Sequence, residues 1–352
     1  MKHLLCTALT GLCMSFPWAY GSASETGTET KTELAKVEIE ARIDWQLDRL
    51  DGKTIDSNTG FEGKYLVVRL DGNITDNLSY SWRQRLNKNH NDGSFFDATD
   101  WVWLNYDIDR TWSVAGGKQV VAIGGWEYDR APIDLYGCSV FWNNIPCYQL
   151  GASASLKLGS SDKLSAQLCQ SPFFTRDNRN LYAYNLMWSG SHGIFSALWS
   201  ANMIEYLPGR YISYLSLGNR FAFGKAALEL DFMNRASSGQ RFLFDDCSVM
   251  GELSVRPTPK WNIAAKMTYD VNRSHSAADF CVLPGTELTM AGACVEFYPL
   301  ANSGSRHSLR FHANCYYSWG KNANEADVMQ DKSLLVDVGV KWDMNLFSIK
   351  RK

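Results

Sequence analysis

Residues 37–48 read VEIEARIDWQLD, in which every odd-numbered residue is apolar and every even-numbered residue is charged or an amide. A period of two predicts a β-strand with one apolar and one polar face. The run is about twelve residues long, and a tilted strand needs roughly 9–11 residues to cross the hydrocarbon of a bilayer. This stretch therefore predicts a strand that spans a membrane.

The same alternation repeats along the rest of the chain, for example in Trp261–Asp270 and Leu309–Trp319. Many of the apolar faces carry aromatic residues near a strand end, as the interfacial girdles of a membrane barrel do. We count about sixteen such segments, within a range of about 14–18, and an even number is expected when both termini lie on the same side of the membrane. Their expected starts lie near residues 37, 64, 78, 99, 112, 147, 163, 181, 194, 210, 225, 247, 261, 285, 307 and 332.

The segments between the expected strands alternate in length. Short turns such as 73–77 and 190–193 follow every second strand, and longer loops follow the others. This rhythm is typical of an antiparallel transmembrane β-barrel with short periplasmic turns and longer outer loops. The connector at 207–210 is short, although the alternation predicts a long loop at this place. The expected long loops are 50–63, 87–98, 124–146, 172–180, 236–246, 273–284 and 320–331.

The N-terminus has the features of a secretory signal peptide. Lys2 precedes an apolar run of about 13 residues, which is too short for a transmembrane helix and is followed by small residues. Cys6 and Cys13 follow leucines, whereas a lipoprotein cysteine follows a small residue. We expect a signal peptide at 1–23 that is cleaved without lipidation, a short polar leader at 24–36 and a barrel at 37–352.

Composition and motifs exclude several classes of function. The net charge of −2 gives no basis for nucleic-acid binding. The seven cysteines after the expected signal are odd in number and have no metal-ligand spacing, so we expect no metal site and no cofactor. No nucleophile-elbow or zinc-protease motif occurs, and His312 has no nearby acid in the sequence to orient it. We therefore predict that the protein is not an enzyme.

Several stretches resemble one family of bacterial porins. Asp71–Tyr80, followed by Arg83–Asn87, is similar to the second hairpin of the phosphate-selective porin O/P family. Gly117–Gln119 also resembles that family, as do Glu296–Leu300 and Leu309–His312. The resemblance implies a trimeric outer-membrane channel. It also implies anion selectivity, although the chain is somewhat short for the family and its predicted lumen is not dominated by lysine and arginine.

Odd and even positions of a strand point to opposite faces, and we call this the parity of a residue. Parity identifies the basic residues that we expect in the lumen. They lie on the first three and the last two strands, which closure of a barrel makes neighbours, so they would form one basic stripe on the inner wall. The ordinary alternative is a set of solvated wall residues at different heights. The predicted basic pore-lining residues are Arg42, Arg69, Arg83, Arg85, Arg310 and Lys341.

The segment 124–146 is the longest connector and would be the third outer loop. Long loops in compact proteins are often functional, so we expect it to fold inward and narrow the pore. An ordinary surface loop remains the alternative. Its acids Glu127, Asp129 and Asp134 would then face the basic stripe. Cys138 and Cys147 could close a disulfide in an oxidising compartment, or remain two free thiols.

Gly116 and Gly117 raise a question of register. Strict alternation from Trp112 would point Lys118 at lipid, which is costly near mid-membrane. We therefore expect a glycine bulge that returns Lys118 to the lumen and leaves Val121 and Ile123 outside.

The sequence thus predicts an outer-membrane porin for passive diffusion of small polar solutes or ions. Acidic residues slightly outnumber basic ones in the predicted lumen, so weak selectivity is expected. The alternatives are an anion- or phosphate-selective porin and a structural or adhesive barrel without a channel. The expected partners are membrane lipid, lipopolysaccharide, the solutes themselves and, from the resemblance, two further copies in a homotrimer.

Overall fold

A computed structural model describes residues 33–88, 95–175, 177–237, 239–240, 244–302, 308–324 and 332–350. The expected signal peptide at 1–23 and most of the leader lie outside these residues. The first strand begins at Glu33, four residues before the expected start of the barrel at 37.

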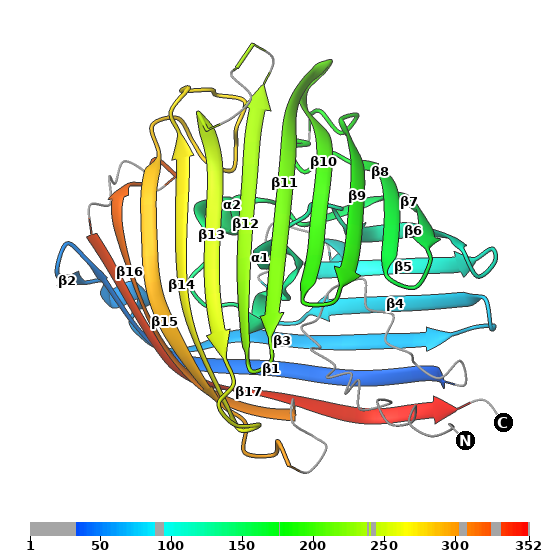
Figure 1. The fold of residues 1–352 in the computed structure, drawn as a ribbon, viewed down its shortest axis with the longest axis horizontal. Helices are drawn as coiled ribbons and strands as arrows, with labels where there is room; N and C mark the ends of the chain where they lie inside the picture. Colours follow the sequence, from blue (N-terminus) through cyan, green and yellow to red (C-terminus); the bar gives the residue numbers. More distant parts are fainter. Residues whose placement is uncertain are drawn as a thin grey trace, which may run out of the picture.

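The described chain forms one antiparallel sheet that closes into a barrel (Figure 1). The sheet contains 17 strands, of which β2 has two residues and lies in the first long loop, so the wall has sixteen strands, as predicted. Each of the sixteen begins within four residues of its expected start. The strands are β1 (Glu33–Leu50), β2 (Lys53–Thr54), β3 (Gly60–Asn73), β4 (Leu78–Arg85), β5 (Thr99–Asp107), β6 (Trp112–Val120), β7 (Tyr148–Leu158), β8 (Asp162–Gln170), β9 (Tyr182–His192), β10 (Phe195–Leu207), β11 (Arg210–Phe223), β12 (Ala226–Ser237), β13 (Asp246–Val255), β14 (Trp261–Asn272), β15 (Glu287–Phe297), β16 (Leu309–Lys321) and β17 (Lys332–Lys350).

The barrel is closed by the first and last strands. β1 pairs with β17 along nearly its whole length, from Glu33 opposite Lys350 to Leu50 opposite Ser333, and Arg42 lies opposite Lys341. β1 also pairs with β3 on its other side, so neither end strand presents a long free edge there. Closure satisfies the backbone N–H and C=O groups, which is what a structure in a bilayer requires.

The distribution of side chains is inverted relative to a soluble protein. On β14, Ile263 and Met267 are 49 % and 51 % exposed, whereas Lys266 between them is 3 % exposed. The apolar residues point away from the barrel axis and the polar ones point into it. An outward apolar band around a polar interior is the arrangement of a transmembrane barrel.

The connectors lie at two ends of the barrel, as predicted. Tight turns such as 159–161 and 193–194 join strands at one end, and the longer loops gather at the other (Figure 1). The short connector after β10 is confirmed, because only Pro208 and Gly209 separate the end of β10 at Leu207 from the start of β11 at Arg210. Gly209 adopts a φ of +71°, which glycine enters without steric cost, and donates its N–H to Glu205 at 2.7 Å.

The expected glycine bulge is absent. β6 pairs with β5 and with β7 without a register shift, so Lys118 keeps the outward parity of Val114. Its ammonium group lies near the end of the strand, where it donates to Phe96 O at 3.0 Å and contacts the Phe96 ring. The outward position is tolerated there because it is close to the loop end of the barrel and not at mid-membrane. Val121 and Ile123 are buried inside the barrel.

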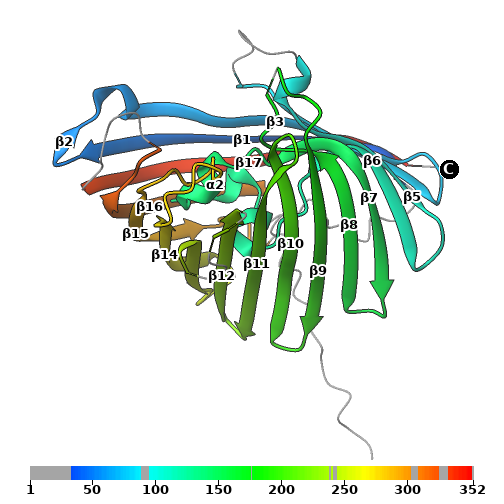
Figure 2. The ribbon, with the colours of Figure 1, turned by 90° about the horizontal axis from the view of Figure 1, so that it is seen from above.

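Helices occur only in the connectors of the described chain. The segment 121–147 between β6 and β7, which we call the inner loop, contains α1 (Trp126–Asp129), a 3-10 turn (Pro132–Asp134) and α2 (Val140–Asn144). Figure 2 shows α2 within the ring of strands. Two further 3-10 turns, Asp56–Asn58 and Phe95–Ala98, lie in the first two long loops. Among the described residues, no helix is long and apolar enough to cross a membrane.

Candidate functional site

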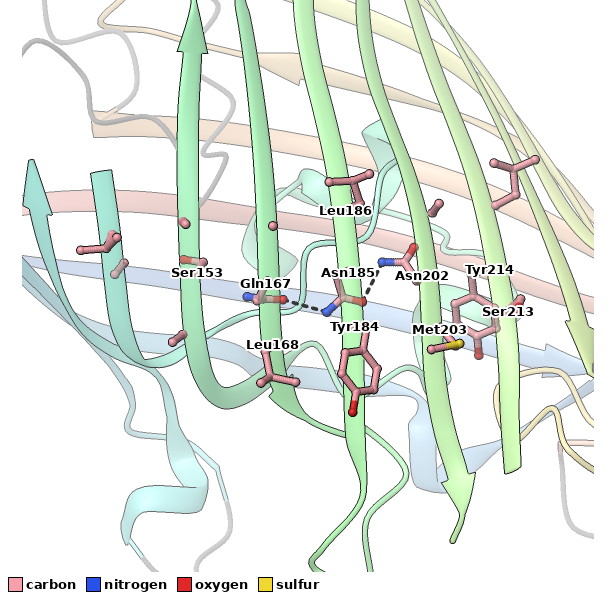
Figure 3. A pocket seen from close by; sticks show the side chains of 17 residues that line it. Ser153, Gln167, Leu168, Tyr184, Asn185, Leu186, Asn202, Met203, Ser213 and Tyr214 are labelled. Carbon is pink, nitrogen blue, oxygen red and sulfur yellow. Dashed lines mark hydrogen bonds between the residues drawn. The ribbon is translucent and has the colours of Figure 1, made fainter. Parts of the chain in front are cut away.

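The inner loop enters the lumen along a wall of neutral polar side chains. Asn202 Nδ2 donates to Asn185 Oδ1 at 2.8 Å, and Asn185 Nδ2 donates to Gln167 Oε1 at 3.0 Å, as Figure 3 shows. This amide ladder crosses β8, β9 and β10 and also binds the loop backbone. Gln167 Oε1 accepts from the N–H of Ala122 at 2.8 Å, and Asn202 Nδ2 donates to Ala122 O at 2.8 Å. The first arm of the loop is therefore held without any charge.

A hollow of about 810 Å³ follows the same part of the wall, from β6 to β11 (Figure 3). It lies on the lipid side and not in the lumen, because the exposed side chains around it are apolar and have outward parity. Leu168, Tyr184, Leu186 and Met203 are 44–49 % exposed, whereas the inward Gln167 of the same wall is 7 % exposed.

The wall also supplies the acceptors for the N-termini of both short helices. Asp231 Oδ2 on β12 accepts from the N–H of Glu127 in α1 at 2.8 Å. Asp270 on β14 accepts from the N–H of Val140 in α2 at 2.9 Å. The first N–H groups of a helix have no partner within it, and a carboxylate there is favoured by the helix dipole. The two helices of the inner loop are thus positioned by barrel carboxylates.

Arg130, at the end of α1, pairs with two glutamates of the wall. Its guanidinium contacts Glu252 at 2.7 and 2.8 Å and also bonds Glu229. The predicted acid Glu127 does not face the basic stripe. Its carboxylate contacts Lys266 on β14 at 2.6 Å and accepts from the N–H of Ser139 at 3.1 Å. Asp129, the second predicted acid, is half-buried.

The tip of the inner loop reaches the basic residues on the far side of the lumen. Asp134 Oδ1 accepts from Arg310 Nη1 at 2.8 Å and from Lys341 Nζ at 3.0 Å. Arg42 Nη1 donates to the backbone oxygen of Leu135 at 2.8 Å. Burial alone would raise the pKa of Asp134, but the charges of Lys341 and Arg310 outweigh it and hold the pKa below its ordinary range. Three predicted pore-lining cations therefore bind the loop.

The ring of Tyr136 lies among these cations. The guanidinium of Arg42 is 4.7 Å from the ring centroid, and that of Arg310 is 5.4 Å from it. The hydroxyl donates to Glu296 Oε1 on β15 at 3.1 Å. Gly137, the next residue, packs against Tyr316 with a φ of +52°, where any larger side chain would collide with that ring. This contact sets the point at which the loop turns back.

The other three predicted cations lie apart from the loop tip, on β3 and β4. Arg69 pairs with Asp71 at 2.5 Å. Arg83 and Arg85 share Asp100, at 3.6 and 3.4 Å. The predicted single stripe is thus two groups, one bound to the loop and one on the wall. The reason is that Asp134 and the backbone of the tip occupy Arg42, Arg310 and Lys341.

Apolar side chains fill the lumen beside β8–β12 at the long-loop end. Phe141 of α2 packs edge-on against Tyr214, with ring centroids 5.6 Å apart. A second loop, residues 273–286, joins this cluster with the fully buried Cys281 and Val282. Asp279 of that loop pairs with Arg235 on β12 at 2.5 Å, and both side chains are at most 1 % exposed. Two loops together therefore occupy this side of the lumen.

The cysteines do not form the disulfide that spacing allowed. Cys138 and Cys147 are both free. Cys147 Sγ contacts Ile145 O at 3.3 Å, and burial raises the pKa of the Cys138 thiol to about 12. Cys138 lies beside the loop tip, whereas Cys147 ends the returning arm next to β7.

His312 has an acidic partner that sequence proximity did not reveal. Its Nε2 lies 2.9 Å from Asp44 Oδ1, and both side chains are fully buried. The expected solvated wall histidine is therefore a packed one beneath the loop tip. Within the described ranges, no cluster of three or more His, Cys, Asp or Glu side chains could hold a metal ion.

The wall acids were missing from the predicted site. Glu229, Asp231, Glu252 and Asp270 all have inward parity on β12–β14, so their direction could be inferred from the alternation. What the alternation could not show is that each of them binds the inner loop.

Comparison with known proteins agrees with this architecture. The sequence profile of the phosphate-selective porin O and P family matches residues 36–195, which confirms the resemblance seen in the sequence. No curated protein sequence matches the chain. Among solved structures, OmpT of Vibrio cholerae in its trimer form has 12 % identity and a TM-score of 0.59 over 89 % of this chain and 100 % of its own. An anion-selective porin from Comamonas acidovorans has 9 % identity and a TM-score of 0.59 over 88 % of this chain and 99 % of its own.

The identities to the solved structures are low, so these likenesses establish the fold alone. The family match agrees with the predictions of an outer-membrane location and of a channel without enzymatic activity.

Proposed function

We propose that this outer-membrane porin is a passive diffusion channel for small polar solutes with a preference for anions. The match to a phosphate-selective family supports an anionic solute class. The preference that we propose is moderate, because every one of the six predicted lumen cations has a carboxylate within 4 Å.

The route of the solute follows from where the lumen is filled. The apolar cluster of the two loops lies beside β8–β12, and the amide ladder fixes the loop arm on the same side. Solutes would then pass along β3 and β4, where Arg69 and Arg85 are located. These two cations, and not the loop-bound ones, would meet the solute first.

The observation that carries the proposal is the unequal exposure of charges on this wall. The side chain of Arg69 is 33 % exposed and that of its partner Asp71 is 7 %. Arg85 is 24 % exposed and Asp100 is 7 %. Within these two pairs the guanidinium group is therefore more exposed to the lumen than its carboxylate, whereas Lys36 and Glu38 on the neighbouring β1 are about equally exposed, at 26 % and 24 %. Charges that line a narrow pore set its ion preference.

A second candidate is a general porin with almost no selectivity. The pairing of all six cations favours it, since a paired charge exerts a weak field beyond a Debye length of about 8 Å at physiological salt. The two candidates differ in the reversal potential of single channels across a potassium chloride gradient. A clear anion preference supports the first, and a value near zero supports the second. A barrel without conductance would overturn both.

A homotrimer is part of the proposal. It is supported by the family resemblance and by the structural neighbour described in a trimer form. Chemical cross-linking in detergent, followed by gel electrophoresis without boiling, should give a species with three times the mass of the monomer. A cross-linked pattern that ends at the monomer would contradict this part alone.

A further inference from the structure

The second loop, residues 273–286, is anchored inside the barrel. Asp279 Oδ2 accepts from Arg235 Nε on β12 at 2.5 Å. Asp279 Oδ1 accepts from the N–H groups of Cys281 and Val282, both at 3.0 Å, and so fixes the turn of the loop around the ion pair. The position of Arg235 is therefore tied to the position of the second loop.

Arg235 also binds the neighbouring strands. Its Nη1 donates to Ser248 Oγ on β13 at 2.6 Å, and its Nη2 donates to Val271 O on β14 at 2.8 Å. The hydroxyl of Ser248 in turn donates to Asp270 Oδ1. An arginine can only donate and a carboxylate can only accept, so the single hydroxyl proton points at Asp270 while Arg235 binds the oxygen from the other side. Ser248 thus links the two charged groups.

Asp270 connects this chain of contacts to the inner loop. Its carboxylate accepts from the N–H of Val140 at 2.9 Å and from that of Phe141 at 3.3 Å, which are the first two residues of α2. The cation connected to Asp270 is Arg235, through Ser248. A buried charge is costly unless it is paired and hydrogen-bonded. The capping of α2 therefore depends on a cation whose place is set by the second loop.

The four polar side chains of this chain of contacts are shielded from water. Arg235, Asp270 and Asp279 are each 1 % exposed, and Ser248 is 7 % exposed. Hydrogen bonds in such an interior polarise one another, and a buried group that loses its partner is costly. Loss of one link therefore weakens the next.

We propose that Arg235, Ser248 and Asp270 form a relay that transmits the position of the second loop to the N-terminus of α2, with Arg235 as a positioning residue for the inner loop. When the second loop is displaced, Arg235 moves with it, Ser248 loses its donor and the cap of α2 weakens. The second loop joins β14 to β15 at the long-loop end of the barrel (Figure 1), so a change there reaches the inner loop in the lumen. The inference rests on the channel function proposed above but not on its ion preference.

The two loops also share an apolar cluster, which offers an ordinary explanation for any coupling between them. Cys281 and Val282 of the second loop belong to the same cluster as Phe141 of α2. Apolar packing does not depend on the hydroxyl of Ser248, whereas the relay does. Removing that hydroxyl therefore separates the two explanations.

Two native cysteines report on the two loops separately. Cys281 is fully buried in the second loop, and the half-buried Cys138 directly precedes Ser139, which caps α2. A thiol that packing shields reacts faster when its segment opens, so its alkylation rate measures local opening. The rates are measured on the folded, full-length protein in detergent, with N-ethylmaleimide at pH 8 and peptide mass spectrometry.

Phe280→Ala displaces the second loop without leaving a buried charge. Phe280 is 44 % exposed and packs edge-on against Phe173 and Tyr206, with ring centroids 5.3 and 6.2 Å away. In this variant the labelling rates of Cys281 and Cys138 should both rise roughly threefold or more, as expected when a helix loses part of its N-terminal cap. If Cys281 responds and Cys138 does not, the second loop does not control the inner loop.

Phe244→Ala is the matched control for this change. Phe244 is 65 % exposed and packs against Phe232 on the outer face of β12. Both labelling rates should stay at their wild-type values. A rise in both rates would mean that loosening any outer loop has this effect, which contradicts a specific relay.

Ser248→Ala is the decisive variant, because it removes the hydroxyl and leaves the anchor of the second loop in place. When it is combined with Phe280→Ala, the rate of Cys281 should still rise, whereas that of Cys138 should stay at the level of Ser248→Ala alone. Ser254→Ala, on the same inner face of β13, is the matched control and should leave the coupling intact. Ser248→Thr keeps the hydroxyl and should restore the coupling. If Cys138 responds fully without the hydroxyl, direct packing couples the loops and the relay is wrong.

Folding of each variant is checked by resistance to SDS before boiling. If Ser248→Ala fails this check, Ser248→Gly removes the same hydroxyl. If Phe280→Ala leaves Cys281 protected, Asp279→Asn breaks the buried ion pair instead, and an unchanged rate of Cys138 in that variant overturns the proposal.

Single-channel recording connects the relay to the channel. Phe280→Ala should give a noisier open-channel current than the wild type, and the added noise should disappear when Ser248→Ala is combined with it and compared with Ser248→Ala alone. Noise that is the same in all variants would contradict an effect on the lumen. A wild-type protein without conductance would overturn the channel function, whereas the labelling rates would still test the relay.

Discussion

Asp231, on the inner face of β12, accepts a hydrogen bond of 2.8 Å from the backbone N–H of Glu127. A residue of the barrel wall thus caps the N-terminus of α1. The helix has only four residues, and Gly125 before it offers no side-chain cap. Its position in the lumen therefore depends on a residue that is about a hundred positions away in the sequence.

Asp231→Ala should loosen α1, because the acceptor of the Glu127 N–H is lost. Loss of a capping carboxylate costs about 0.5–2 kcal/mol. We expect a noisier open-channel current and faster proteolysis within the inner loop. Asp231→Asn keeps an acceptor oxygen and should stay close to the wild type. Equal effects of alanine and asparagine would show that the cap is not what positions the helix.

Arg130→Met should destabilise the barrel by about 3–5 kcal/mol, because Glu252 would lose the cation that it binds and Glu229 would keep only Arg220, at 3.6 Å. The free energy of unfolding can be measured in detergent with urea and tryptophan fluorescence. The triple change Arg130→Met, Glu229→Gln and Glu252→Gln should recover most of the loss. If the triple variant is as unstable as the single one, packing of Arg130 and not its charge is responsible.

Deleting residues 129–141 should raise the single-channel conductance, because it removes the tip, the last residue of α1 and the first two residues of α2 from the lumen. The barrel should remain resistant to SDS before boiling, since no wall strand is touched. Deleting 55–59 from the first long loop is the matched control and should leave conductance unchanged. A folded 129–141 deletion with wild-type conductance would mean that the inner loop does not limit the current.

The double change Arg83→Glu and Arg85→Glu should move the reversal potential toward cations, because it converts the wall group on β4 from basic to acidic. Asp129→Lys should move it toward anions. Arg49→Glu, on an outward-facing position of β1, controls for the net charge of the protein and should have no effect. A shift toward cations in Arg49→Glu as large as that in the double variant would show that net charge, and not the lumen wall, sets selectivity.

All seven cysteines of residues 33–350 should react with an alkylating reagent after denaturation without a reductant, because none is in a disulfide. In the folded protein at pH 8, Cys138 should react slowly, since burial raises the pKa of its thiol to about 12 and little thiolate is present. Mass spectrometry counts the labels. If two further thiols are labelled only after reduction, the Cys138–Cys147 disulfide is present in the protein.

Much of the wall could be predicted because each strand carries its own alternation. Trp261–Asn272 shows in twelve residues which side faces lipid and which faces the lumen. The register at Gly116 and Gly117 could not be predicted, since it depends on where Lys118 lies relative to the membrane. In the structure the Lys118 ammonium group binds Phe96 O, in a loop 22 residues earlier, which the pattern of β6 does not record.

The candidate site was only half predictable for a similar reason. Parity placed Arg310 and Lys341 inside the barrel, and loop length indicated that 124–146 folds inward. The ion pairs that these residues form depend on the three-dimensional fold and not on the local sequence. His312 and Asp44 are 268 residues apart and lie at 2.9 Å, and Lys341 and Asp134 are 207 residues apart. No local pattern records such pairs.

The seam between β1 and β17 constrains when the molecule can form. β1 leaves the ribosome first and β17 last, and each is the other's hydrogen-bonding partner over 17 residue pairs. A nascent chain can build hairpins from neighbouring strands, but it cannot complete the wall until synthesis has ended. Until then, two strand edges with apolar faces stay unpaired and are prone to aggregation. The polypeptide must therefore be kept unfolded on its way to the membrane, and a chain that stops before residue 332 should be degraded and not inserted.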